Sequence, residues 1–284
     1  MGCELKRRFH FRWLALPLLL LALAWAGREA ATGLRRQALS GARYQPPPSG
    51  MVLVPAGYFW MGSDDAAAEP DEQPRRQVFL PAFYMDAVEV TNRRYQTLVP
   101  EHRFPPGEED LPVTHVLKRE AEEFCRRAGR RLPTTAEWEK AARGTEGRVY
   151  PWGNEFNPDF ANIRRRTTPG TNNMADCKSP LAPAHGKLAG GSFPKGASPY
   201  GCQDMAGNVW EWVSDVWKDS VPFGQSAGEG RGILRGGAYN YSPLQARTSH
   251  QGFEDLDATC HDVGFRSALN AVPRRGEGRV ISHQ

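Results

Sequence analysis

The stretch Asp204-Met205-Ala206-Gly207-Asn208-Val209-Trp210-Glu211-Trp212 combines a turn, acidic side chains and the start of an apolar strand. Gly207 allows a tight backbone, so that carbonyl oxygens and a carboxylate can converge on one point. The stretch therefore predicts a tight turn that leads into a strand, and the simplest role of Asp204 and Glu211 is to cap that turn and bond backbone amides.

Short strands are predicted on both sides of this stretch. Residues 51–61 and 78–90 are rich in β-branched and aromatic residues and are broken by Pro and Gly, as short strands are. Three further apolar runs, at 210–213, 233–239 and 263–269, have the same character. These segments predict a fold that contains several short strands.

Two helices are predicted between the strands. Residues 117–128 carry apolar side chains at helical spacing and end at Gly129. Thr134-x-x-Glu137 is a capping box, which predicts a second helix through Trp138. Residues 154–200 are polar and show no periodic spacing of apolar residues. Long segments of this kind inside a domain are often held in place by metals or disulfides. The fold class is therefore an irregular α+β domain with little regular secondary structure.

Composition excludes several classes of protein. Hydrophobic residues make up 40% of the 284 residues and charged residues 24%, which excludes a disordered tail, a collagen and a coiled coil. Most of the net charge of +4 lies at the N-terminus, in Lys6, Arg7, Arg8 and Arg12. Acidic and basic residues alternate in the rest of the chain without a cluster of Lys or Arg, so no nucleic-acid partner is expected.

The N-terminus has the pattern of a secretory leader. A basic stretch, Lys6–Arg12, precedes an apolar run, Trp13–Ala26, which is shorter than the ~18–20 residues of a spanning helix. Ala24 and Ala26 fit a cleavage site before Gly27. We expect a signal peptide at 1–26, a periplasmic location and no stable membrane insertion after cleavage. An uncleaved anchor and a twin-arginine signal are the alternatives.

The mature chain divides into three parts by composition. Residues 27–50 are a polar linker that ends in a Pro-rich run, 51–271 form the domain, and 272–284 are a tail. Cysteines outside the leader are Cys125, Cys177, Cys202 and Cys260. In an oxidising compartment they can form two disulfides, with three connectivities open.

Eight segments together resemble the formylglycine-generating enzyme family, also called the sulfatase-modifying factor domain. The likeness covers about residues 51–271 in order, and the fold it implies is a variant of the C-type lectin fold. The segments are Val54–Gly57 with Met61–Ser63, Glu89–Asn92, Pro112–Val116, Arg131–Glu139, Pro151–Asn154, Asp204–Trp212, Arg235–Gly237 and Gly264–Arg266.

The resemblance implies two structural calcium sites. The first takes the side chains of Asp204 and Glu211 with the carbonyls of Gly207 and Val209. A second site takes four residues that would pin the irregular 154–200 stretch: the side chains of Asn162 and Asp176 and the carbonyls of Ile163 and Lys178.

The chain departs from the family where the family oxidises its substrate. Two cysteines that bind copper(I) follow the Arg-Gly-Gly motif in the family, but here their positions hold Tyr241 and Ala246, and Ala238 replaces a family serine. Copper(I) prefers thiolates, so no copper is expected there and formylglycine formation is excluded. The iron-dependent ergothioneine branch is not expected either, because that branch adds a His-rich helical bundle and the seven His here are scattered.

Acid–base side chains follow the Arg-Gly-Gly segment. Glu254 is the predicted general base, His250 and Asp255 are further candidates, and Tyr241 is expected near the substrate. The alternative for Glu254 and Asp255 is a solvated acidic loop. Trp210, Trp212, Tyr239 and Tyr241 would stack on a planar ligand or pack in the core.

One branch of the family is exported and lacks the cysteine pair, and it matures the siderophore pyoverdine. The resemblance implies a peptide-siderophore substrate whose dihydropyoverdine chromophore is oxidised. The sequence has no flavin or nicotinamide motif, so dioxygen or a partner would take the electrons. A non-catalytic lectin-like binding module and a maturation helper for a periplasmic copper nitrite reductase are the alternatives. The oligomeric state is left open.

Overall fold

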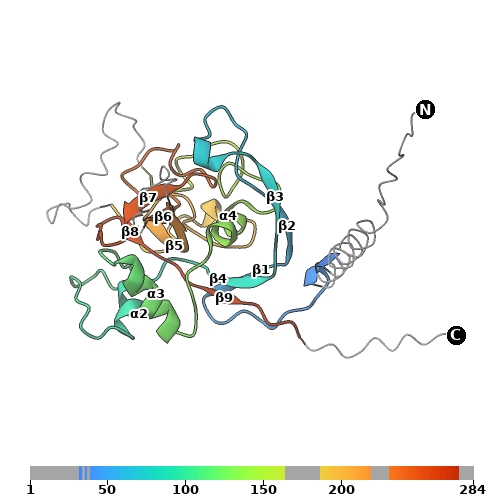
Figure 1. Ribbon diagram of the computed structural model, residues 1–284. Coiled ribbons are helices and arrows are strands. Elements are labelled where there is room, and N and C mark those ends of the chain that lie inside the picture. The colour runs from blue at the N-terminus through green and yellow to red at the C-terminus, as the bar shows by residue number, and fades with distance from the viewer. Residues whose placement is uncertain (1–31, 34–35, 37–38, 164–185, 219–229, 275–284) are drawn as a thin grey trace, which may run out of the picture.

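The computed structural model describes the chain between residues 39 and 274 apart from 164–185 and 219–229, together with Thr32, Gly33 and Arg36 (Figure 1). The predicted signal peptide at 1–26 lies outside these residues. Within the described part, no helix is both long enough and apolar enough to span a bilayer.

Two of the sheets are antiparallel and come from the first half of the domain and its end. β4 (Phe83–Asp86) is the centre of one sheet, between β1 (Met51–Val54) and β9 (Ala268–Asn270). β2 (Gly57–Met61) pairs with β3 (Arg76–Leu80). The strands predicted within 51–61 and 78–90 are therefore confirmed, each broken in two at its Pro.

The third sheet carries the candidate site. Its order is β7 (Gly252–Asp255), β6 (Arg231–Arg235), β5 (Trp210–Trp217) and β8 (Val263–Gly264). β8 runs parallel to β5, and the other pairs are antiparallel. Since β7 lies at one edge of the sheet, the side chains of this strand are accessible from outside.

The predicted helices are confirmed as α3 (Lys118–Arg127) and α4 (Thr135–Arg143), and a short α2 (Asn92–Gln96) precedes them. Single 3-10 turns occur at Pro70–Glu72 (η1) and Pro194–Gly196 (η3). The Thr134 hydroxyl accepts from the Glu137 amide at 3.2 Å, and the Glu137 carboxylate accepts from the Thr134 amide at 2.9 Å. The capping box therefore starts α4 as its sequence predicts.

α4 lies between two of the sheets, in contact with β2 and β3 on one side and β5 and β6 on the other (Figure 1). Trp138 of α4 is fully buried in a core cluster with Met85, Val213 and Ile233. A second core cluster packs α3 against β5 and β6, with Phe124 among its members. Each such side chain contributes roughly 1.5–3 kcal/mol by leaving water.

A buried ion cluster fixes α4 to the segments around it. Oε1 of Glu139 accepts from the Gly62 amide at 2.6 Å and from Arg143 at 2.7 Å, and Oε2 accepts from Arg235 at 2.8 Å. Arg235 also donates to the carbonyls of Ser249 and Thr248, at 3.0 and 2.6 Å. The cluster thereby joins α4, the turn after β2, the end of β6 and the segment that precedes β7.

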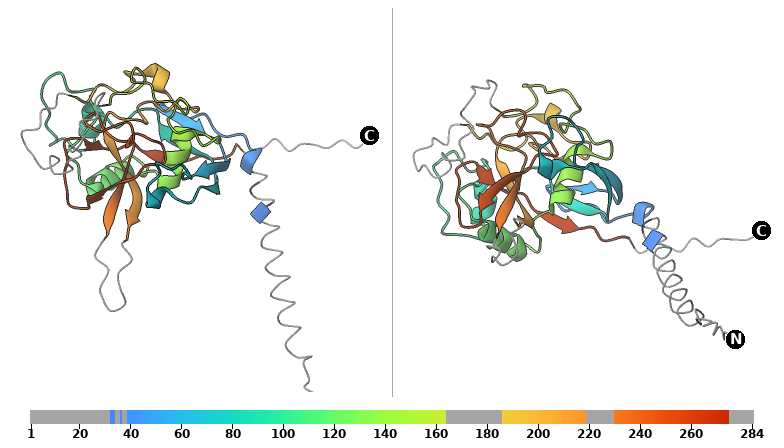
Figure 2. Two further views of the ribbon diagram at one scale, coloured as in Figure 1. Left: turned by 90° about the horizontal axis from the view of Figure 1, so that it is seen from above. Right: turned by 45° about the horizontal axis from the view of Figure 1, so that its top comes forward.

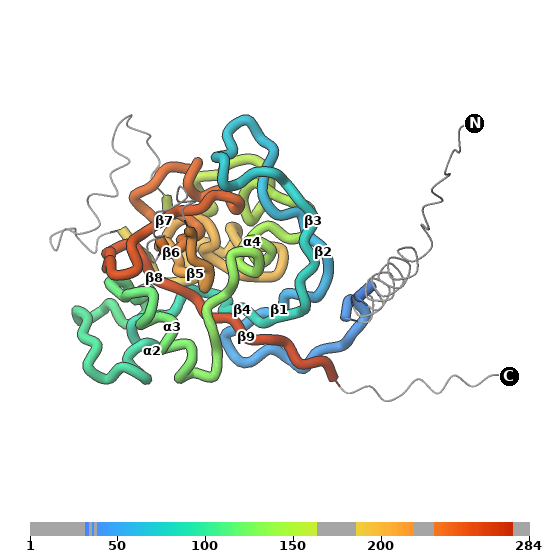
Figure 3. Tube along the Cα trace, viewed as in Figure 1, coloured from blue at the N-terminus to red at the C-terminus, as the bar shows by residue number. Residues whose placement is uncertain are grey.

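The two ends of the described chain lie side by side, as the blue and red parts of the tube show (Figure 3; Figure 2 gives two further views). Tyr44 forms an isolated β-bridge with Pro273. The Tyr84 hydroxyl donates to the Gln45 carbonyl at 2.6 Å. The end of the segment expected to be a linker thus packs on the domain.

Two predicted elements differ from the structure. The strand expected at 233–239 ends at Arg235, because Gly236 and Gly237 have φ of 96° and 73°, which no strand tolerates. The acidic stretch around Glu254, weighed above as a loop, is the edge strand β7. Its pairing to β6 has no local signature in the sequence.

The prediction of two disulfides is wrong. Cys125 and Cys202 are free and fully buried, and burial raises their thiol pKa values to about 12 and about 11. They lie in different core clusters, where each packs as a small apolar side chain. Cys260 is disulfide-bonded, and Cys177 lies outside the described residues.

We expect Glu139→Ala to lower the free energy of unfolding by roughly 3–5 kcal/mol, because it leaves Arg143 and Arg235 buried without a counter-charge. Urea unfolding measures this. Glu123→Ala is the matched control, since the Glu123–Arg126 pair is exposed, and it should leave the midpoint unchanged. Equal effects of the two variants would contradict the structural role of the cluster.

Candidate functional site

A cavity of about 210 Å³ lies beside the edge strand β7, and we call it the aromatic pocket. Its walls come from all four strands of the third sheet and from the segments that follow β6 and precede β8. The residues that line it are Trp210, Arg231, Leu234, Tyr241, Gln245, His250, Gln251, Gly252, Phe253, Glu254, Cys260, Asp262 and Val263.

Aromatic rings form one wall of this pocket. The Tyr241 ring meets the Trp210 ring edge to face, with centroids 5.3 Å apart at 83°, and the His250 ring lies 6.0 Å from Trp210. The Tyr241 amide donates to the Ala238 carbonyl at 2.9 Å, which fixes the backbone there. A planar ligand would therefore meet both a ring face and a ring edge.

The structure brings the three predicted catalytic residues together. Tyr241, His250 and Glu254 lie on the wall of the aromatic pocket, although they come from a turn, a loop and a strand. Asp262 is also there, and its Oδ2 accepts from Asn240 at 3.0 Å. The catalytic role of the three stays a prediction.

A buried carboxylate lies behind His250 and was not predicted. Oε1 of Glu72 is 3.5 Å from Nδ1 of His250 and 2.6 Å from Nη2 of Arg247. Burial raises the pKa of Glu72, but the side chains of His250 and Ser249 and the charge of Arg247 outweigh it and lower the pKa to about 2. Glu72 belongs to η1, and no sequence pattern relates η1 to the segment before β7.

The two positions that hold cysteines in the family have separate surroundings here. Tyr241 lines the aromatic pocket, whereas Ala246 is fully buried in a cluster with Tyr150 and Ile163. The sulfur of Cys260 also lies on the pocket wall, 3.7 Å from Oε2 of Glu254, but it is disulfide-bonded. Neither family position offers a thiolate to copper(I).

The first predicted calcium site surrounds a buried ion pair. Arg266 donates from Nε to Oε2 of Glu211 at 2.7 Å and from Nη2 to Oε1 at 2.6 Å. Trp138 Nε1 also donates to Oε2, at 2.8 Å. A carboxylate has about four lone-pair sites, so Glu211 keeps acceptor capacity after these bonds.

Asp204 and a residue that sequence reasoning missed, Glu89, add negative charge beside Glu211. Oδ2 of Asp204 accepts from the Gly191 amide at 2.6 Å, and Oε1 of Glu89 accepts from Asn208 at 2.9 Å. Oε2 of Glu89 is buried with no hydrogen-bond partner among the described residues. Burial, and next the Asp204 charge, raise the pKa of Glu89 well above its ordinary value, and burial likewise raises that of Asp204.

These donors fit a cation such as calcium, because three carboxylates surround one arginine and one oxygen has no partner. In the described residues no three His, Cys, Asp or Glu side chains form a metal cluster, so the carbonyls would have to complete the site. Gly207 has φ 84°, and a Cβ there would lie 2.1 Å from the Asn162 carbonyl oxygen. Only glycine fits this turn.

The second predicted calcium site is described only in part. Asn162 donates to Oδ1 of Asn208 at 3.1 Å and to the Gly186 carbonyl, and Ile163 is buried. Asp176 and Lys178 lie outside the described residues. Asn162 therefore contacts the turn of the first site.

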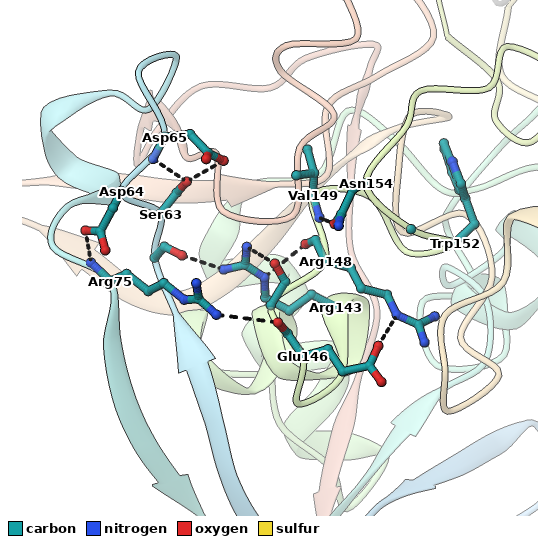
Figure 4. A pocket seen from close by; sticks show the side chains of 13 residues that line it. Ser63, Asp64, Asp65, Arg75, Arg143, Glu146, Arg148, Val149, Trp152 and Asn154 are labelled. Atoms are coloured by element: carbon teal, nitrogen blue, oxygen red, sulfur yellow. Dashed lines mark hydrogen bonds and ion pairs between the residues drawn. The ribbon is translucent and has the colours of Figure 1, made fainter.

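A larger hollow, of about 690 Å³, lies elsewhere, between the turn after β2 and the segment after α4 (Figure 4). Its charged side chains have partners in its own wall. Arg148 pairs with Glu146 at 3.0 Å, and Asp64 accepts from the Arg75 amide at 3.0 Å. Arg143 binds Glu139, as described above. The aromatic pocket is the better candidate for chemistry, because it combines an apolar wall with acid–base groups.

Sequence and structure comparisons identify the family and the fold. Residues 36–271 match the sulfatase-modifying factor enzyme 1-like domain. The chain is 31% identical to the formylglycine-generating enzyme of Bos taurus, over 81% of this chain and 77% of that protein. It is 28% identical to the inactive C-alpha-formylglycine-generating enzyme 2 of Mus musculus, over 78% of this chain and 86% of that protein.

The structure of PvdO from Pseudomonas aeruginosa is similar in fold, with a TM-score of 0.60 at 22% identity over 81% of this chain and 98% of that chain. The fold is thus the irregular α+β fold of formylglycine-generating enzymes and their relatives. The chain belongs to the sulfatase-modifying factor enzyme 1-like family.

Glu72→Gln should lower stability in a pH-dependent way. The folded-state pKa of about 2 is below the ordinary 4.5, so the ionised carboxylate stabilises the fold above pH 4.5 and this stability is lost as the pH falls towards 2. The shift corresponds to about 3 kcal/mol. Urea unfolding of both proteins at several pH values should show a gap at pH 7 that narrows below pH 4.5. A gap that does not change with pH would contradict this.

Proposed function

We propose that this protein is an exported maturation factor that oxidises the dihydropyoverdine chromophore of a peptide siderophore in the periplasm. The observation that carries the proposal is the aromatic pocket, whose wall holds Tyr241, His250 and Glu254 together with the Trp210 ring. The leader at Lys6–Ala26, the missing cysteine pair and the PvdO-like fold support this branch.

The chemistry is a two-electron oxidation. The dihydro ring loses two electrons and two protons, and dioxygen takes them up to give hydrogen peroxide. Glu254 removes the first proton as general base, a role that typically contributes ~10²–10⁴-fold in rate. Tyr241 and Trp210 hold the planar ring by edge and face contacts.

A non-catalytic, lectin-like binding module is the second candidate. The large polar hollow of Figure 4 favours it, because Trp152 lies on its wall, stacked on Tyr150 at 5.3 Å and 7°. Trp152 is half-buried, and an accessible ring beside polar groups suits ligands with both apolar and hydroxylated faces. Such a module would bind a ligand without any need for Glu254.

Glu254→Gln should stop chromophore maturation without unfolding the protein, because it keeps the shape of the side chain and removes its basicity. In a strain that carries only the variant, dihydropyoverdine should accumulate in place of fluorescent pyoverdine, which absorbance and fluorescence of the culture medium report. The loss should be ~10²–10⁴-fold in rate.

Asp255→Asn is the matched control, since Asp255 is the next residue on β7, is exposed and does not line the pocket. It should mature pyoverdine as the wild type does. Normal maturation by Glu254→Gln would reject the base and favour the binding module. Equal melting curves of the three proteins exclude misfolding as the cause.

We further propose that calcium binds at two sites. One is formed by Asp204, Gly207, Val209 and Glu211, and the other by Asn162, Ile163, Asp176 and Lys178. The unpartnered Glu89 oxygen and the surplus of negative charge beside Arg266 support the first. When bound, calcium would supply positive charge there, and this chain's residues would hold the turn at Gly207.

Chelation should lower the melting temperature, because a ligand at a hundredfold excess over its Kd stabilises the folded state by roughly 2.7 kcal/mol. Glu89→Gln should melt higher than the wild type in chelator, since it removes a buried, repelled charge, and should respond less to added calcium. Differential scanning calorimetry with and without chelator measures both. Glu101→Gln is the control, because Glu101 is exposed. A melting curve that chelator leaves unmoved would contradict the proposal.

A further inference from the structure

A third cavity, of about 270 Å³, lies near the aromatic pocket, and nothing above assigns it a role. We call it the acidic cavity. Its wall is formed by η1, the start of α4 and the outer part of β5. The residues that matter here are Asp71, Glu72, Thr135, Asp215 and Trp217.

The acidic cavity and the aromatic pocket adjoin the same sheet but have different walls. Ile233 and Leu234 are neighbours on β6, so their side chains point to opposite faces, and Ile233 lines the acidic cavity whereas Leu234 lines the aromatic pocket. Trp217 and Phe253, with ring centroids 5.1 Å apart, line one cavity each. Gln251 lines both. The two cavities are therefore adjacent but distinct.

Two buried oxygens on the wall of the acidic cavity have no hydrogen-bond partner among the described residues. They are Oγ1 of Thr135, which is 7% exposed, and Oε2 of Glu72, which is 2% exposed. Buried polar atoms are bonded in the great majority of cases. Two unpartnered oxygens that line one cavity indicate a site for a ligand that donates hydrogen bonds.

The charge of the wall indicates the sign of that ligand. Glu72 is already paired with Arg247, and Glu139 is paired in the buried cluster. Asp71 and Asp215 form no ion pair with any described residue, but each accepts a hydrogen bond: Oδ2 of Asp71 from Gln251 at 3.3 Å, and Oδ2 of Asp215 from the Thr135 amide at 2.6 Å. Arg76 is the one cation in the described wall, so the two aspartates outnumber it. Burial is the main cause that raises the pKa of Asp71, and the charges of His250 and Arg235 act in the opposite direction.

The other groups in the wall suit an organic cation. The Trp217 ring lies in this wall, where it also packs against Phe253, and the Thr135 hydroxyl can accept a hydrogen bond from an N–H donor. Among the described residues no three His, Cys, Asp or Glu side chains form a metal cluster, so the side chains of this wall do not make a metal site by themselves.

We propose that the acidic cavity binds a cationic organic group, an alkylammonium or guanidinium, between Asp71, Asp215, the Thr135 hydroxyl and the Trp217 ring. The bound group donates N–H bonds to the two unpartnered oxygens and supplies the missing positive charge. The site is separate from the aromatic pocket, so the proposal does not rest on pyoverdine oxidation.

Titration of the mature protein with n-butylammonium and with n-butylguanidinium tests the site, and n-butanol is the neutral probe of similar shape. Both cations should shift the backbone NMR signals of Thr135 and the indole signal of Trp217, whereas butanol should not. Equal shifts from butanol, or shifts confined to the hollow that contains Asp64 and Asp65, would overturn the proposal.

Thr135→Val is the sharpest variant, because valine keeps the shape and removes only the hydroxyl. It should weaken n-butylammonium binding about tenfold, the cost of one lost bond to a charged group. It should also melt no lower than the wild type, since it removes an unsatisfied buried oxygen. Unchanged binding with a lowered melting temperature would mean that the hydroxyl serves the fold alone.

Asp71→Asn and Asp215→Asn test the same site without changing Thr135, so they remain informative if Thr135→Val fails to fold. Each should weaken binding of both cations, and 0.5 M salt should weaken it further. Asp65→Asn, in the separate hollow of Figure 4, is the matched control and should bind as the wild type does. Equal binding by the two variants and the control would overturn the proposal. The aromatic pocket is tested separately, by chromophore maturation in the Glu254→Gln variant.

Discussion

The rest of the structure depends on the buried carboxylate of Glu139. It accepts hydrogen bonds from Gly62, Arg143 and Arg235, which come from a turn, its own helix and a strand of another sheet. Because Arg235 also binds the carbonyls just before His250, the cluster sets the position of that ring on the aromatic pocket. Removing one partner of such a cluster leaves uncompensated charge in the interior, which is strongly destabilising.

Buried acidic groups in this protein fall into two kinds. Glu139 and Glu211 are matched by arginines and hold segments of the fold together. Glu89 and the partly buried Asp71 form no ion pair with a described residue, and burial raises their pKa values although Arg266 and Arg235 lie nearby. An unmatched buried charge is costly, so these positions mark sites where a bound cation would lower the free energy. Structural and ligand-binding acids can thus be told apart by their partners.

The chain has the family fold, and the two positions that the resemblance matches to the family's cysteines are Tyr241 and Ala246. Tyr241 lies on the pocket wall, and Ala246 lies in a buried cluster away from that pocket. The pocket that is left has an aromatic wall and acid–base groups, which suit proton removal from a planar ring. Family membership therefore defines the scaffold, and the residues of the site define what it can do.

The sequence by itself determined whatever rests on local hydrogen bonds and periodicity: the start of α4 at Thr134, the short strands, the family, and Tyr241, His250 and Glu254 as candidates. Only the tertiary structure decided that Glu254 lies on an edge strand, that Glu72 lies behind His250, and that two of the expected disulfide cysteines are free core residues. The physical reason is how far apart in the sequence the interacting residues lie. A capping box is satisfied within one turn, whereas strand pairing and the partner of a buried charge depend on segments far apart in the chain, whose encounter no local pattern encodes.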